Sequence, residues 1–281
     1  MSSFSVLLPV YIADRVDFVE RAIRSATIEQ TLPPTQLVIV CDGPVQAEVA
    51  ALLAKAESTA GSELIGNTQL TIMRTAKNQG LSAALNLGLT GCKYDIVARA
   101  DADDISLPTR FAKQIPYFEK GYDLVGSALT EFTDDEYHLG LTRKMPESET
   151  EIKKTARLRD PFNHPTVVYR ASKVRECGGY QHINHMEDYW LFARMIKAGV
   201  RCQNLPESLV LYRIGAGAYA RRGGFTLLRS EFLLQRKLRQ LGITSRIDFL
   251  KNILLRCGYR IIPSKVRKAL YQTVGKLRWF K

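Results

Sequence analysis

The first hundred residues alternate four times between a short apolar run and a segment with apolar residues at helical spacing. This alternation is typical of a mainly parallel central sheet covered by helices on both faces. We therefore predict an α/β fold. Pro9 has no amide hydrogen, so the first strand is expected to end in a loop at Pro9, and Asp14 is expected to cap the first helix. The predicted strands lie within residues 5–12, 37–42, 70–74 and 95–100.

Length and composition fit one large domain, or one domain plus an appendage, because 281 residues with 46% hydrophobic side chains can bury a sizeable core. The five cysteines form no C-x-x-C pair, so we predict neither a disulfide framework nor a zinc site, and we expect a reducing compartment. The sequence shows no signal peptide, and its apolar stretches are shorter than the about 18 residues of a membrane span. We expect a cytoplasmic protein, peripheral on the inner face of the cell membrane.

The net charge of +12 arises in the last part of the chain. Residues 1–220 contain 24 Lys and Arg against 26 Asp and Glu, whereas residues 221–281 contain 16 against 2. In the latter, Leu and Phe recur at helical spacing among basic residues, which suits helices on an anionic membrane surface or amphipathic helices packed on the main domain. A nucleic-acid reading module is not evident, so no nucleic-acid partner is expected. We predict a domain at 1–220 and a basic helical extension at 221–281.

Polar side chains follow each of the four predicted strands. They are Tyr11, Asp42, Asn78, and Asp101 with Asp103. In an open α/β sheet, ligands bind beyond the carboxyl ends of the strands. The sequence therefore predicts a single binding crevice at this edge.

The acidic turn after the fourth strand has two interpretations. Asp101, Asp103 and Asp104 are close in sequence, and crowded carboxylates repel one another unless a divalent cation lies among them. The turn could instead be solvated and cap the next helix, a role that fits Asp104. Because polar side chains follow all four predicted strands at the same edge of the sheet, a binding site is the favoured interpretation of this turn.

The second half departs from the strict alternation. Strands are predicted at 122–132 and 166–169, and a helix opens with Glu187 and Asp188 in its first turn. Acidic residues there stabilise a helix by about 0.3–1 kcal/mol through its dipole, so a structural role is available to both. His164, His182 and His185 are candidates for a metal ligand or for a contact with a phosphate group, but a structural or surface role is the favoured interpretation of each.

Five segments in order resemble family 2 glycosyltransferases of GT-A type, in the subgroup that builds bacterial capsule, exopolysaccharide and lipopolysaccharide sugars. They are VLLPVYI, IVCDG, N-x-G-x-x-x-A-x-N from Asn78, RADADD with LPTR, and MEDYWLFARM. The resemblance covers residues 4 to about 213. It implies a GT-A fold with a nucleotide-binding half at 1–120 and an acceptor-binding half at 121–220.

The resemblance also implies roles for individual residues. The nucleotide-sugar donor, with UDP as the expected nucleotide, would be bound by Pro9, Tyr11, Asp42, Asn78, Gly80, Asp101 and Ala102. Asp103, with Asp101, would hold Mn²⁺ or Mg²⁺. Asp188 would be the catalytic base, with Glu187 beside it. Arg213, Arg221 and Arg222 could clamp the diphosphate or contact lipid phosphates.

The chemistry of these residues is consistent with an inverting transfer. A hard cation neutralises the negative charge that develops on a leaving diphosphate, and a carboxylate accepts the proton of the attacking hydroxyl. The expected acceptor is a glycan, linked to a polyprenyl diphosphate. The alternative is a non-catalytic nucleotide-binding or membrane-associated scaffold. A phosphatase of the D-x-D type is disfavoured, because its acidic pair follows the first strand and not the fourth.

Overall fold

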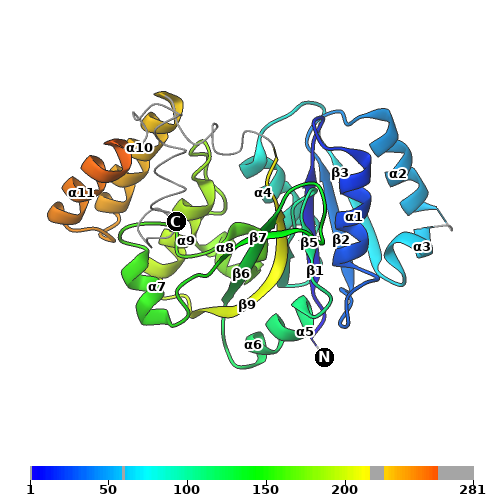
Figure 1. Ribbon diagram of the computed structural model, residues 1–281, viewed down its shortest axis with the longest axis horizontal. Coiled ribbons are helices and arrows are strands. Elements are labelled where there is room, and N and C mark those ends of the chain that lie inside the picture. Colours follow the sequence, from blue (N-terminus) through cyan, green and yellow to red (C-terminus); the bar gives the residue numbers. More distant parts are fainter. Residues whose placement is uncertain (1, 59–60, 216–224, 259–281) are drawn as a thin grey trace.

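The computed structural model describes residues 2–58, 61–215 and 225–258 (Figure 1). Its strands form one sheet in the order β3-β2-β1-β4-β8-β6-β9-β5, with β7 beside β6. The strands are β1 (Ser5–Val10), β2 (Gln36–Cys41), β3 (Gln69–Arg74), β4 (Ile96–Arg99), β5 (Ile105–Ser106), β6 (Leu124–Phe132), β7 (Leu139–Arg143), β8 (Val168–Arg170) and β9 (Cys202–Arg213). The α/β fold with helices around a central sheet is confirmed.

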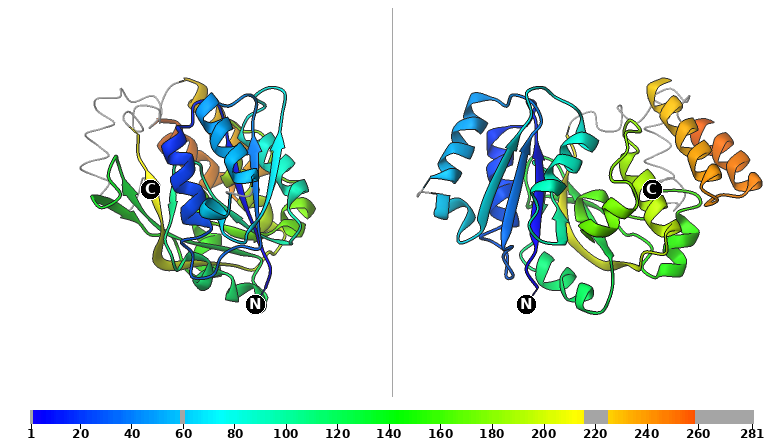
Figure 2. Two further views of the ribbon diagram at one scale, coloured as in Figure 1. Left: turned by 90° about the vertical axis from the view of Figure 1, so that its right-hand side faces the viewer. Right: turned by 180° about the vertical axis from the view of Figure 1, so that it is seen from behind.

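Helices cover both faces of the sheet (Figure 2). One face carries α1 (Val16–Ala26), α2 (Ala47–Glu57), α3 (Ser62–Ile65), α5 (Arg110–Gln114) and α6 (Pro116–Glu119). The other carries α4 (Leu81–Gly91), α7 (Glu149–Thr155), α8 (Ala171–Glu176) and α9 (Glu187–Lys197), with the short helix η2 (His164–Thr166) nearby.

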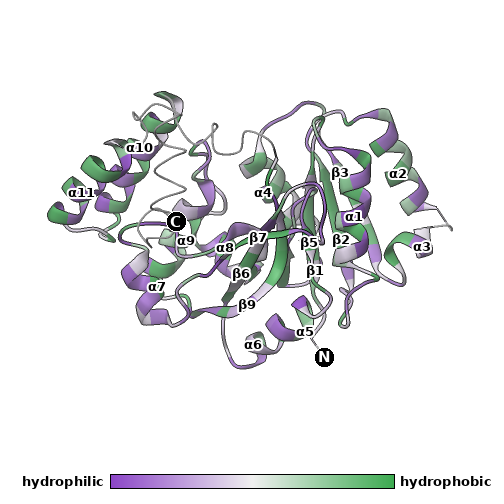
Figure 3. Ribbon diagram, viewed as in Figure 1, coloured by the Kyte–Doolittle hydropathy of each residue, from purple (hydrophilic) through white to green (hydrophobic). Residues whose placement is uncertain are grey.

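The four N-terminal strands are parallel, as predicted, and β1 and β2 are buried on both faces. In β1, Val6 and Leu8 pack with Val19 of α1, whereas Leu7 packs with Leu85 of α4 on the opposite face. All five side chains are fully buried. Burial of each is worth about 1.5–3 kcal/mol. Most residues of β1 and β2 carry the hydrophobic colour in Figure 3.

Pro9 does not end the first strand, which was expected to stop there. β1 continues to Val10, and Pro9 is paired in register with Val40. The carbonyl of Leu7 accepts a hydrogen bond from the β4 side, and the carbonyl of Val10 accepts one from the β2 side. Because backbone groups alternate between the two sides of a strand, the backbone of Pro9 faces the β4 side, as that of Leu7 does. Pairing with β4 ends at Leu7, so no partner there requires the missing amide hydrogen.

The C-terminal half of the sheet is mixed. β8 runs antiparallel to β4 and β6, β6 runs parallel to β9, and β5 and β7 pair antiparallel at the edges. The long strand β9 was not predicted. Pro206 and Glu207 interrupt its apolar pattern, and its register with β6 shifts twice between Ser127 and Leu129.

Two helices follow the sheet domain, α10 (Phe225–Gln240) and α11 (Arg246–Asn252), and α11 continues into a π-helical turn, η4 (Ile253–Cys257). Leu234 and Leu238 of α10 are buried against Tyr189 and Trp190 of α9. The predicted packed face therefore exists. In the described part of the chain, no helix is both long and apolar enough to cross a bilayer. The proposed boundary at residue 220 falls outside the described residues.

Candidate active site

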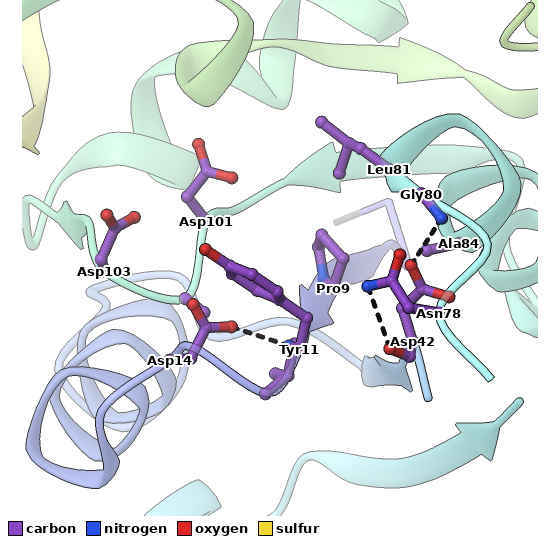
Figure 4. A pocket seen from close by; sticks show the side chains of 12 residues that line it. Pro9, Tyr11, Asp14, Asp42, Asn78, Gly80, Leu81, Ala84, Asp101 and Asp103 are labelled. Carbon is purple, nitrogen blue, oxygen red and sulfur yellow. Dashed lines mark hydrogen bonds between the residues drawn. The ribbon is translucent and has the colours of Figure 1, made fainter. Parts of the chain in front are cut away.

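A cavity of about 380 Å³ opens at the carboxyl ends of β1, β2 and β4. This volume lies within the usual range of small-molecule sites, about 300–1,000 Å³. Figure 4 shows its lining side chains converging from separate loops. The lining residues include every residue predicted to bind donor or metal: Pro9, Tyr11, Asp42, Asn78, Gly80, Asp101, Ala102 and Asp103.

Asp42 organises the loop on one side of this cavity. Its two carboxylate oxygens accept hydrogen bonds from the backbone amides of Gln79 and Gly80, each at 2.8 Å. Gly80 has φ 88°, a left-handed conformation that favours glycine, and it precedes the first residue of α4. Asp42 therefore fixes this loop from the wall of the cavity, and the Thr75 hydroxyl donates a further hydrogen bond to one of its carboxylate oxygens at 3.3 Å.

Asp14 lies in the cavity instead of capping α1, which was a wrong prediction. The residue before α1 is Arg15, and Asp14 accepts a hydrogen bond from the amide of Tyr11 at 2.8 Å. Burial, and to a lesser extent the carboxylates of Asp103 and Asp101, raise the pKa of Asp14 to about 7. The cavity thus carries one more acidic group than the sequence indicated.

The acidic turn brings three carboxylates together. Asp101, Asp103 and Asp104 each present an oxygen within 4.8 Å of the other two. Desolvation and the Asp101 carboxylate raise the pKa of Asp103 to about 6, and the same causes raise the pKa of Asp104. Clustered, mutually repelling oxygen ligands suit a hard divalent cation, so the donor set fits Mn²⁺ or Mg²⁺.

Asp104 does not cap the following helix, as had been suggested. It is buried, and its carboxylate accepts the backbone amide of Arg213 at 2.9 Å. The Arg213 guanidinium donates to the carbonyls of Asp103 and Thr133, each at 3.0 Å, and stacks on the ring of Phe18. Arg213 therefore supports the acidic turn from behind.

A buried arginine, Arg99, links the two halves of the site. It forms an ion pair with Asp101 and is only 2% exposed. Its charge also opposes the upward pKa shift of Asp188, so the guanidinium acts on Asp101 in the cavity and on Asp188 in α9. The sequence reasoning assigned no role to Arg99, although its place at the end of β4 was a usable signal.

The predicted base lies on the acceptor half, outside the cavity lining. Glu187 and Asp188 form the first turn of α9, and Asp188 accepts the amide of Tyr189 at 2.7 Å. Burial, and then the adjacent Glu187 carboxylate, raise the pKa of Asp188 to about 7. A carboxylate with this pKa is suited to accepting a proton at neutral pH.

Asn86 of α4 joins the donor half to the turn that precedes α9. Its side chain donates to the carbonyl of Tyr180 and accepts the amide of Tyr180, both at 2.8 Å. The Tyr180 hydroxyl meets His164 at 3.0 Å, and burial lowers the pKa of this histidine. His164 is therefore a structural residue, while His182 and His185 are exposed.

The comparisons with known proteins agree with this geometry. The model for glycosyl transferase family 2 matches residues 5–183, which contain the cavity and the acidic turn. The chain belongs to this family. It is 38% identical over 271 residues to the amylovoran biosynthesis glycosyltransferase AmsE of Erwinia amylovora, covering 96% of this chain and 98% of the relative. It is thus a glycosyltransferase, as the motifs predicted.

A second relative of this glycosyltransferase is the UDP-Gal:alpha-D-GlcNAc-diphosphoundecaprenol beta-1,3-galactosyltransferase of Escherichia coli, 32% identical over 96% of each chain. Among solved structures, TarS 1-349 of S. aureus has a TM-score of 0.66, with 15% identity over 98% of this chain and 76% of that one. The mannosyltransferase PcManGT of Pyrobaculum calidifontis, solved with GDP-Man and Mn2+, has a TM-score of 0.63, with 14% identity over 98% and 75%. The GT-A fold is confirmed.

Two residues considered for diphosphate or lipid contact, Arg221 and Arg222, lie outside the described residues. Arg213 was the third. Because its guanidinium is engaged with two backbone carbonyls, it supports the turn in this structure and does not project from a loop.

Proposed function

We propose that this glycosyltransferase moves a sugar from a UDP-sugar to a hydroxyl of a polyprenyl-diphosphate-linked glycan, with inversion at the anomeric carbon. The observation that carries the proposal is the cavity, where the predicted donor residues and the acidic turn meet. Asp188 belongs to the first turn of α9, outside the cavity lining, and inversion would follow from its approaching the anomeric carbon on the side away from the leaving group.

Donor binding is assigned to the loops of the N-terminal half. Pro9 and Tyr11 supply surface for the nucleobase, and Asp42 accepts a hydrogen bond from it. Asn78, Gly80 and Ala102 complete the wall around the nucleotide-sugar, and Asp101 binds the ribose. The choice of UDP is supported by the related E. coli enzyme, whose name specifies UDP-Gal.

Asp101 and Asp103 would hold the divalent cation. The cation supplies charge neutralisation for the leaving diphosphate when bound. Asp103 is the more exposed of the two, and Arg99 and Arg213 secure the turn that presents them. Support for a divalent cation comes from the three clustered oxygens and from the Mn2+ named with the structurally similar mannosyltransferase.

Asp188 accepts the proton of the attacking hydroxyl, and Glu187 tunes it. Because the Glu187 carboxylate contributes to the raised pKa of Asp188, it increases the affinity of the base for that proton. Glu187 thereby helps to match the base to neutral pH.

The C-terminal helices supply a surface for an anionic membrane on the inner face of the cell. Their two acids in residues 225–258 are neutralised within the protein, Glu231 by Arg256 and Asp248 by Arg157. Apolar and basic side chains of α10, α11 and η4 face solvent together, a pattern that binds anionic lipid. These exposed residues are Phe225, Arg229, Phe232, Leu233, Arg236, Arg246, Ile247, Leu250, Lys251, Leu254 and Leu255.

The proposed function is tested by incubating the enzyme with a panel of nucleotide sugars, Mn²⁺ and a polyprenyl-diphosphate-linked acceptor. We expect transfer from a UDP-sugar that stops when EDTA is added and resumes with excess Mn²⁺ or Mg²⁺. NMR of the product linkage reports the anomeric configuration. Transfer that persists in EDTA, or a retained configuration, contradicts the proposal.

A further inference from the structure

A buried polar network joins the C-terminal helices to one another. Glu231 of α10 is fully buried and pairs with Arg256 of η4, with 2.7 Å between carboxylate oxygen and Nε. Gln235, one turn further along α10, donates to the same Glu231 oxygen at 3.0 Å and accepts from Asn252 of α11 at 2.8 Å. Three helical segments therefore share one set of charge-assisted hydrogen bonds.

This network ends on the backbone of the acceptor half. Asn252 donates to the carbonyl of Arg157 at 2.9 Å, and Arg256 donates to the carbonyl of Leu158 at 3.2 Å. A single guanidinium thus holds both the Glu231 carboxylate and the loop after α7. Lysine could not reproduce this fork, because its ammonium is a single nitrogen.

The same loop contacts the first turn of α9 on its other side. The hydroxyl of Tyr189, the residue after Asp188, donates to the carbonyl of Ala156 at 2.8 Å. Asp160 follows in this loop, and burial together with the Asp188 carboxylate raises the pKa of Asp160, because the two acids lie close together. The loop at 156–160 is therefore held between the C-terminal helices and the proposed base.

A buried ion pair is a costly way to pack two helices. Apolar residues of similar volume often give equal or greater stability, because desolvation of the charges offsets their attraction. The ion pair, however, fixes the position of the Leu158 carbonyl through a directional hydrogen bond from Arg256. Packing of aliphatic side chains would not fix that position.

We propose that the Glu231–Arg256 pair is a positioning element of the acceptor site, which fixes residues 156–160 against Tyr189 and thereby holds Asp188 in place for proton transfer. This inference rests on the proposed role of Asp188. The C-terminal helices would then have two functions. Their exposed face would bind the membrane, and their buried face would position the acceptor site.

The test uses two variants of the full chain. Arg256→Lys keeps the charge opposite Glu231 but loses the fork to Leu158. The double variant Glu231→Gln/Arg256→Gln removes both charges of the pair together. We expect both to bind UDP with Mn²⁺ within about twofold of the parent by calorimetry, while acceptor-dependent kcat falls about tenfold or more.

The control is Glu207→Gln, which removes an exposed ion pair with Lys113 in the sheet domain and should leave both quantities unchanged. The proposal is overturned if either variant keeps parental kcat, or if UDP affinity and kcat fall together, which indicates general loss of structure. Asp188→Asn is measured alongside. If that variant keeps transfer activity, the base assignment itself fails, an outcome distinct from failure of the positioning role.

Discussion

Two carboxylates, Asp103 and Asp188, have pKa values raised by the same two causes, burial and a neighbouring carboxylate, but they lie in different surroundings. Asp103 is shifted to about 6 by desolvation and by Asp101, a neighbour that a cation would screen. Asp188 is shifted to about 7 by burial and by Glu187, and it sits apart from the acidic turn. The surroundings of Asp103 therefore suit a metal ligand, and the surroundings of Asp188 suit a group that accepts a proton.

Transfer should depend on the ionisation of Asp188. With a pKa of about 7, the carboxylate is mostly protonated at pH 6 and mostly ionised at pH 8, so kcat should rise with pH across this interval. Asp188→Asn should lower kcat by about 10²–10⁴-fold and remove this rise. A pH–rate profile checks both. An unchanged profile in the variant would assign the base to another residue.

Stability without metal should fall as pH rises from about 4 to 7. In that window the raised pKa values of Asp14, Asp103 and Asp104 make the folded protein bind more protons than the unfolded chain, so the free energy of unfolding decreases with pH. At pH 8, Mn²⁺ at 100 times its Kd should restore about 2.7 kcal/mol.

Thermal denaturation with EDTA or Mn²⁺ measures this effect. In Asp103→Asn, the Mn²⁺-dependent rise in Tm should be lost, and the protein without metal should be more stable at pH 8 than the parent. An equal Mn²⁺ effect in parent and variant would mean that Asp103 does not bind the metal.

At the level of elements, the site depends on how closely α4 approaches the sheet. A Cβ at Gly88 would come within 2.2 Å of a Leu7 methyl group and 2.8 Å of a Val40 methyl group, both in buried strands. α4 begins at the loop held by Asp42 and carries Asn86, so its distance from the sheet also sets the position of both halves of the site.

Gly88→Ala should therefore destabilise the protein. Overpacking costs about 1–3 kcal/mol, and the better helix propensity of alanine returns up to about 1 kcal/mol. Gly91→Ala in the same helix is the control, because its Cβ would meet the flexible end of Met73. Urea denaturation should give a lower midpoint for Gly88→Ala only. Equal midpoints would show that α4 can move away from the sheet without cost.

At the scale of the whole molecule, the proposed membrane surface depends on the distribution of exposed charge. Reversing two exposed basic residues, Arg236→Glu/Lys251→Glu, should weaken binding to anionic vesicles, since each lost Lys or Arg contact is worth about 1 kcal/mol. The matched control is Lys55→Glu/Lys93→Glu in the donor half, with the same change in net charge. Flotation with phosphatidylglycerol-containing liposomes distinguishes them. Equal flotation of both variants would rule out this surface.

Much of the donor half could be predicted because its signals are local. The alternation of apolar strands and amphipathic helices, and a polar residue after each strand, placed Tyr11, Asp42, Asn78 and Asp101 at one edge, where the cavity lies. The C-terminal half, where the sheet is mixed, was harder to predict from the sequence. The strand β9 is interrupted at Pro206 and pairs with β6, about eighty residues earlier in the chain, so its pattern alone did not identify it.

The sequence by itself determined the fold class, the family and the carboxylates Asp42, Asp101 and Asp103 of the cavity, though not Asp14, because periodicity and strand-end chemistry depend on neighbouring residues. Only the tertiary structure decided what surrounds those carboxylates. Arg213 supports the acidic turn and Arg256 holds the loop before Asp160 through contacts about a hundred residues apart in the chain. Such contacts leave no local pattern, because they depend on where the packed sheet and helices bring distant segments together.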